Sequence, residues 1–186
     1  IKEIDTALKI LTKKINKKNI TVLHCNTNYP AKFDEINLNA IKFMKKKFNV
    51  DIGYSDHTSG IEVSLAATAL GASIIEKHFT LDKKLPGPDH KASLSPRELY
   101  NLVKGIKIIN KSMGDSKKIA TKGELKNKIA VRKSIFASKK IIRGEKFTYK
   151  NLVIKRPGNG ISPMLIKKLI NKKSKFNFEE DEMIKL

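Results

Sequence analysis

Four histidines are the side chains of this sequence best suited to proton transfer or metal binding near neutral pH. His24, His57 and His78 each follow a short apolar run, in "ITVLHCN", "DIGYSDHT" and "ASIIEKHF", and His90 lies in "GPDHKAS". Residues 91–186 contain no histidine. A single histidine is more often structural than functional, so a functional role requires a fold that brings several of them together.

The segments around the histidines alternate between strand-like and helix-like patterns. Short β-branched runs at 19–26, 49–55 and 72–79 predict strands. Apolar residues at helical spacing predict helices over 1–15, 34–48, 61–70 and 95–110. This alternation with short connections predicts an α/β fold of parallel β/α units. In such folds the loops after the carboxyl ends of the strands carry the chemistry, and all four histidines fall at or beyond a strand end.

Two of these helices carry more specific signals. In the helix expected over 34–48, the side chains predicted to face inward are Ile41, Phe43, Met44 and Phe48. The helix expected over 95–110 opens with Ser95, Pro96 and Glu98, which form a capping box with proline in the first turn. The first helix begins at residue 1 with no start methionine and no cap, so we expect the chain to be a piece of something longer.

The composition limits the classes of function. The 186 residues carry a net charge of +21, which raises nucleic acid as a partner. The lysines are spread along the chain and no nucleic-acid-binding motif accompanies them, so neither nucleic acid nor a membrane is expected as a partner. No apolar run approaches the roughly 20 residues of a membrane span, and the expected location is the cytoplasm. A single cysteine excludes an internal disulfide, and Cys25 is expected to be a buried, inert thiol.

A change of pattern divides the chain into two domains. From about Ser112 to Lys128 the periodicity gives way to Lys, Gly, Ser and Thr, which is typical of a linker. The expected organisation is a first domain over 1–113, a linker over 114–128 and a small domain over 129–186. The small domain is expected to contain short strands, glycine turns and one short helix capped by Ser162.

Five motifs in order carry a resemblance to a known family: "LHCNTNYP", "GYSDHT", "EKHFTLD", "GPDHKASLSP" and "VIKRPGNGISP". Together they resemble the sialic acid synthase family, which includes N-acetylneuraminate and legionaminic acid synthases. The resemblance implies the C-terminal portion of a (β/α)8 TIM barrel followed by a small β-clip, antifreeze-like (SAF) domain. The family's phosphate-binding lysines and acid/base glutamates would lie on the missing first half of the barrel, so we expect the 186-residue chain alone to be inactive.

The resemblance also implies a reaction. Enzymes of this family condense phosphoenolpyruvate with an N-acylated mannosamine-type sugar, giving a nine-carbon 2-keto sugar acid and phosphate by cleavage of a C–O bond. His57 and His78 match the family's metal ligands, and imidazoles from two adjacent strand ends can converge on one divalent ion. Two imidazoles favour Mn²⁺ over Mg²⁺.

Further residues match the family's substrate contacts. Ser55 and Asn26 resemble positions that hydrogen-bond phosphoenolpyruvate, with Thr27 a rival for the role of Asn26, and Tyr29 is expected to line the sugar pocket. Asp89 is expected to contact sugar hydroxyls at the catalytic centre. His24 and His90 are assigned structural or supporting roles.

Arg156 is the small domain's candidate. The rigid "PGNG" turn would hold its guanidinium in one direction. In the family this arginine enters the partner subunit's barrel and contacts the N-acyl group of the sugar, which implies a domain-swapped homodimer.

Three other functions remain open at this level. A pseudaminic acid synthase of the same family is the nearest alternative, although "GPDHKASL" favours the sialic or legionaminic branch. The second is a non-catalytic module that binds an anion or ice, and the third is a basic nucleic-acid-binding protein.

Overall fold

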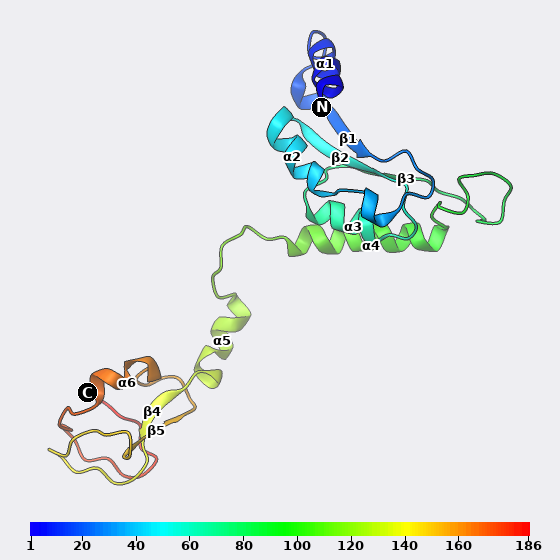
Figure 1. Ribbon diagram of the computed structural model, residues 1–186. Coiled ribbons are helices and arrows are strands. Elements are labelled where there is room, and N and C mark those ends of the chain that lie inside the picture. Colours follow the sequence, from blue (N-terminus) through cyan, green and yellow to red (C-terminus); the bar gives the residue numbers. More distant parts are fainter. The chain divides into compact units, whose positions relative to one another are not determined.

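The computed structural model describes residues 1–186 and consists of two compact units, Ile1–Lys117 and Lys118–Leu186 (Figure 1). Each unit has its own cluster of buried apolar side chains. No helix in the structure is both long enough and apolar enough to span a membrane.

The first unit is built on a parallel sheet. Its strands β1 (Thr21–Cys25), β2 (Asp51–Asp56) and β3 (Ile75–Lys77) pair in the order β1-β2-β3. Helices α2 (Asn39–Phe48) and α3 (Glu62–Ala69) make the two connections, so the chain runs β1-α2-β2-α3-β3, as the alternating sequence pattern predicted. The parallel register aligns the carboxyl ends of all three strands at one edge of the sheet.

Helix α2 is shorter than the sequence predicted. The expected helix over 34–48 is divided into a 3₁₀ turn at Phe33–Glu35 and α2, because Asn37 lies between them with a φ of 52°. Asparagine tolerates this left-handed conformation, which a continuous right-handed helix cannot contain. Helix α1 (Lys2–Leu11) likewise ends earlier than expected.

The prediction that Phe43 faces inward is wrong. Ile41, Met44 and Phe48 are buried, whereas Phe43 is 54% exposed. At about 100° per residue, positions 41, 44 and 48 share one face of the helix and position 43 lies on the opposite face. Only the first three side chains can therefore pack against the sheet.

The helices cover one face of the sheet. Ile52, Tyr54 and, from the neighbouring strands, Val22 and Ile75 belong to the same apolar cluster as the inward side chains of α2 and α3. Side chains alternate along a strand, so Cys25, Ser55 and Glu76 lie on the other face. Gly53 allows β2 and β3 to approach, since a Cβ there would lie 2.9 Å from the carbonyl oxygen of Ile74.

The second unit is a small β domain entered through helix α5 (Lys122–Val131). Strands β4 (Ser134–Ala137) and β5 (Leu152–Lys155) are antiparallel, and a 3₁₀ turn at Pro163–Leu165 leads into α6 (Ile166–Leu169). As expected, the hydroxyl of Ser162 caps that turn. The segment expected to be a linker, 114–128, instead contains much of α5. The apolar periodicity gave no sign of this helix because none of its residues is buried.

Helix α4 (Pro96–Ser112) starts with the predicted capping box. The hydroxyl of Ser95 accepts a bond from the Glu98 amide, and the Glu98 carboxylate accepts one from the Ser95 amide at 2.8 Å. Lys83, in the loop after β3, lies 2.7 Å from the same carboxylate. The hydrogen bond from Lys83, followed by that from the Ser95 amide, lowers the pKa of Glu98 from 4.5 to about 2. The carboxylate thus ties this loop to the start of α4.

We predict that Glu98→Gln destabilises the first unit by about 1 kcal/mol near pH 7, a value reduced for the partial exposure of the pair. Because the folded pKa is lowered, this stabilisation is present above the unfolded value of 4.5 and is lost as the pH falls towards 2. Urea denaturation at several pH values should show that the difference in free energy of unfolding between the variant and wild type becomes smaller in acid. A constant difference would contradict the prediction. Lys83→Met, which leaves the capping box intact, should raise the pKa of Glu98.

Candidate functional site

Two imidazoles meet at the carboxyl edge of the sheet. His57 directly follows β2 and His78 directly follows β3, and their ring centroids are 5.1 Å apart. The ring of Tyr29 lies beside both, with its centroid 4.2 Å from that of His57 and 5.6 Å from that of His78. The adjacency predicted for these two histidines is therefore present, and Tyr29, from the loop after β1, completes an aromatic cluster with them.

The orientation of His57 is set by the loop that follows β1. Its Nδ1 lies 2.8 Å from the backbone carbonyl oxygen of Asn26. A carbonyl can only accept, so Nδ1 carries a hydrogen, and the tautomer of the neutral ring that fits this contact has its lone pair on Nε2. The carbonyl of His57 in turn accepts a bond from the Ala31 amide at 2.9 Å. The segment from Asn26 to Ala31, which contains Tyr29, is thus fastened to His57 at both ends.

The side chain of Asn26 makes two contacts within the loop that follows β1. Its side-chain oxygen accepts a bond from the Asn28 amide, and its side-chain nitrogen donates to the carbonyl of Glu35. The side-chain amide of Asn26 therefore uses one of its two N–H donors within the loop. The visible role of Asn26 is to orient His57 through its backbone. Thr27, the alternative residue, is exposed.

The loop after His78 returns to the same edge. The Leu94 amide donates to the His78 carbonyl at 2.8 Å, and the Thr80 amide donates to the Leu94 carbonyl at 2.9 Å, which closes the loop between them. Asp89, near the tip, places a carboxylate oxygen 3.8 Å from Nδ1 of His78. His90 bonds the Thr80 hydroxyl at 2.9 Å and so supports the loop from inside. Asp89 is the member of this loop that reaches the histidine pair.

Ser55 has an acidic partner that the sequence reasoning missed. Its hydroxyl donates to the carboxylate of Glu76 at 2.7 Å across the β2/β3 pairing. Glu76 lies in β3, two residues before His78, and is exposed on the helix-free face. Residues two apart along a strand share a face, so the spacing between Glu76 and His78 was the signal in the sequence for this contact. The site therefore contains a serine and a carboxylate beside the two imidazoles.

Behind the histidines lies a buried ion pair, also missed. Asp56 and Lys77 are paired in the strand register, and their charged atoms are 3.0 Å apart with side-chain exposures of 0% and 3%. Tyr54 and Thr58 donate hydroxyl bonds to the Asp56 carboxylate. Burial raises the pKa of Tyr54, and the negative charge of Asp56 raises it further, so Tyr54 stays a neutral donor.

The remaining residues of β1 behave differently from one another. His24 faces the helices and bonds the carbonyl of Ile36 at 2.7 Å, which is a structural role. The prediction of a buried thiol is wrong, because Cys25 is exposed. As the last residue of β1, Cys25 points to the face without helices, where its sulfur lies 3.8 Å from Nδ1 of His57.

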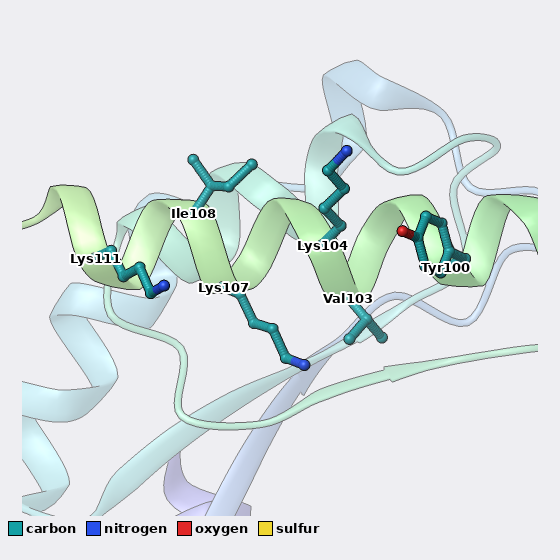
Figure 2. Close-up of a pocket in the computed structure, with 6 residues that line it drawn as sticks. All are labelled: Tyr100, Val103, Lys104, Lys107, Ile108 and Lys111. Atoms are coloured by element: carbon teal, nitrogen blue, oxygen red, sulfur yellow. The ribbon is translucent and has the colours of Figure 1, made fainter.

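A surface hollow on α4 is separate from this chemistry. Figure 2 shows its lining, which alternates apolar side chains with lysines along one side of the helix: Tyr100, Val103, Lys104, Lys107, Ile108 and Lys111. It contains no histidine, carboxylate or hydroxyl other than that of Tyr100. None of these residues belongs to the histidine cluster.

Arg156 lies in the second unit, on a turn held by its own surroundings. The Gly158 amide donates to the Ile129 carbonyl, and the Gly160 amide donates to the Ser134 hydroxyl, each at 2.8 Å. A Cβ on Gly158 would lie 2.3 Å from the Cβ of Arg132, so the turn packs too closely for a side chain there. Arg156 itself is exposed and takes part in no salt bridge.

The donor set of the site fits part of a metal coordination sphere. His57 presents an Nε2 lone pair and is oriented by a backbone carbonyl, which is the usual support of a ligating histidine. His78 is its neighbour. No group of three or more His, Cys, Asp or Glu side chains converges in this chain. Two protein ligands would leave the other positions to water, substrate or further residues.

Parallel β/α units with a polar site at the carboxyl edge of the strands define an α/β protein of the kind that binds ligands at this edge, and comparison with known proteins identifies the family. Residues 1–118 match the NeuB family model and residues 132–186 match the SAF domain. This chain belongs to the NeuB family, the family of sialic acid synthases. The resemblance inferred from the five motifs is confirmed.

Individual relatives agree. The chain is 54% identical to the N,N'-diacetyllegionaminic acid synthase of Campylobacter jejuni over 98% of this chain and 55% of that protein. It is 35% identical to the pseudaminic acid synthase of the same species over 93% of this chain and 50% of that one. The crystal structure of the N-acetylneuraminic acid synthetase of Leptospira borgpetersenii in complex with citrate matches with a TM-score of 0.61 at 43% identity, over 68% of this chain and 44% of that chain. The chain spans about half the length of the curated relatives it matches.

Proposed function

We propose that the enzyme containing this chain condenses phosphoenolpyruvate with an N-acylated mannosamine-type sugar, giving a nine-carbon 2-keto sugar acid and phosphate. The observation that carries the proposal is the apposed pair His57 and His78 at the ends of adjacent parallel strands, in a chain 54% identical to a legionaminic acid synthase. We further assign the three strands to a (β/α)8 barrel, in keeping with their parallel order and the unpaired outer edges of β1 and β3.

His57 and His78 are the residues that would hold a divalent ion, and Mn²⁺ suits two imidazoles better than Mg²⁺. When bound, the ion would supply Lewis-acid chemistry to the aldehyde of the open-chain sugar. The Asn26 carbonyl keeps the Nε2 lone pair of His57 available by holding the hydrogen on Nδ1. The Tyr29 ring lies against both imidazoles.

The other side chains of the edge are assigned to substrate binding. Ser55 offers a hydroxyl on the same face as the histidines, where it would contact phosphoenolpyruvate, and Glu76 accepts the hydrogen bond of this hydroxyl. Asp89 is half exposed, and its carboxylate would accept hydrogen bonds from sugar hydroxyls beside His78. In this reaction the C–O bond of phosphoenolpyruvate breaks, so the bridging oxygen leaves with the phosphate.

The choice of sugar rests on the sequence identities to two kinds of synthase. The identity of 54% to a legionaminic acid synthase against 35% to a pseudaminic acid synthase favours a sialic- or legionaminic-type sugar. The test is to offer the complete enzyme each sugar with phosphoenolpyruvate labelled with ¹⁸O in the bridging position. Labelled phosphate released with a sialic- or legionaminic-type sugar is expected. Turnover with the pseudaminic-type sugar alone would overturn the assignment.

We predict that His57→Ala or His78→Ala in the complete enzyme lowers condensation more than about 100-fold, since loss of even a supporting contact to a metal ligand costs 10- to 100-fold. Bound Mn²⁺, measured by elemental analysis, should fall in parallel. His24→Gln is the matched control, because His24 lies on the neighbouring strand but faces the helices. Full turnover after exhaustive chelation would remove the metal from the mechanism.

We also propose that Arg156 of one subunit contacts the N-acyl carbonyl of the sugar bound to the other subunit of a domain-swapped homodimer. Its exposed guanidinium, on a turn fixed by backbone bonds, is free to meet a ligand. The planar fork of arginine places donors that a lysine cannot reproduce.

Arg156→Ala should therefore raise the KM for the sugar about tenfold or more, for a lost charged hydrogen bond of about 1.5 to 3 kcal/mol, while the KM for phosphoenolpyruvate changes little. Arg156→Lys should recover only part of the loss. The subunit claim is tested by mixing Arg156→Ala with His57→Ala subunits. A heterodimer with one working site supports the exchange, and heterodimers with none would show that Arg156 acts within its own chain.

A further inference from the structure

The buried pair of Asp56 and Lys77 has a position that stability alone does not explain. Asp56 is the covalent neighbour of His57, and Lys77 is the covalent neighbour of His78. The two are direct partners in the β2/β3 register, with Nζ of Lys77 3.0 Å from the carboxylate of Asp56. Because side chains alternate, the pair projects to the helix side of the sheet and the imidazoles to the other.

The contacts of the Asp56 carboxylate hold the turn that carries His57. One carboxylate oxygen accepts bonds from the backbone amide of Thr58 at 2.8 Å and from its hydroxyl at 2.7 Å. The other accepts the hydroxyl of Ser64, in the first turn of α3, at 2.5 Å. The side chain of Asp56, the residue before His57, therefore holds the backbone of Thr58, the residue after it, and is itself anchored to α3.

Lys77 acts on the same turn from the neighbouring strand. Besides the carboxylate, its ammonium donates to the carbonyl of Thr58 at 2.6 Å. The lysine thus joins the end of β3 to the residue directly after His57. An apolar pair of the same size could fill this space, but it would supply no directional bond across the strands.

We propose that Asp56 and Lys77 are positioning residues that hold His57 and His78 at the separation required to bind one divalent ion. The inference rests on the proposed function for the identity of the ligand, but the geometry of the turn can be measured without it. If the pair sets the geometry, breaking it separates or rotates the imidazoles even when the fold survives. If the pair only stabilised the fold, a variant would change the geometry of the histidines only as far as it lowers the free energy of unfolding.

The variants separate these two roles. Lys77→Met and Asp56→Asn each leave a buried charge unpaired and should lower Tm, whereas the double variant Asp56→Asn/Lys77→Met has no unpaired charge and should recover part of the loss. The double variant still lacks the lysine's bonds to Asp56 and Thr58. Two controls are Ile41→Ala, which destabilises the same core from α2, and Lys45→Met, the same substitution beside Asp51 at the start of β2.

The first measurement is the Mn²⁺ affinity of the complete enzyme without substrates. It is obtained by titration, with the free ion detected by electron paramagnetic resonance. We expect both single variants and the double variant to bind Mn²⁺ 10- to 100-fold more weakly, as for other contacts that orient metal ligands. The controls should stay within about twofold of wild type, including Ile41→Ala despite its lower Tm. Affinity that returns in the double variant together with Tm would overturn the proposal.

The second measurement needs no metal. In protein labelled with ¹⁵N at histidine, the hydrogen-bonded Nδ1 proton of His57 should give a resonance that is lost or shifted in the pair variants and kept in Ile41→Ala. If His57→Ala binds Mn²⁺ as well as wild type, the assignment of His57 as a metal ligand fails. The resonance of the Nδ1 proton is then the test of the positioning role. An unchanged resonance in Asp56→Asn/Lys77→Met would then refute the positioning role.

Discussion

The register between β2 and β3 is the constraint on which the rest of the first unit depends. It pairs Ser55 with Glu76 and Asp56 with Lys77. Successive residues of the two strands therefore form a hydroxyl–carboxylate hydrogen bond on the helix-free face and a buried ion pair on the helix side. The next step brings His57 and His78 side by side. A shift of one residue on either strand would turn each of these side chains to the wrong face and separate all three pairs.

The loops around the histidines are ordered by backbone bonds to this edge. The loop after β1 is attached at Asn26 and Ala31, both of which bond His57. The loop after β3 closes where Leu94 bonds the His78 carbonyl. Tyr29 and Asp89 reach the site because the segments that carry them are fastened to the histidines themselves. The same residues that would bind a metal therefore also organise the loops that follow β1 and β3.

In the second unit, local bonds and close packing hold the turn that follows Arg156. The turn after Arg156 bonds to Ile129 and Ser134 through backbone amides, and close packing at Gly158 leaves it no room to move. Buried Asn151 satisfies the Thr148 amide and the Lys146 carbonyl in a loop beneath the small core. The loops of this small domain are thus tied by local bonds rather than by long helices or strands.

The sequence by itself determined the order of strands and helices, the capped start of α4 and the placement of His57 and His78 after neighbouring strands, because periodicity and capping are local properties of the chain. The motif spacing also identified the family. The tertiary structure alone decided that Asn37 interrupts a helix, that Cys25 and Phe43 are exposed and that α5 begins inside the expected linker. It also decided the contacts of Glu76, Asp56 and Lys77. These contacts join residues about 20 positions apart in sequence, and only the register and packing of the sheet bring them together.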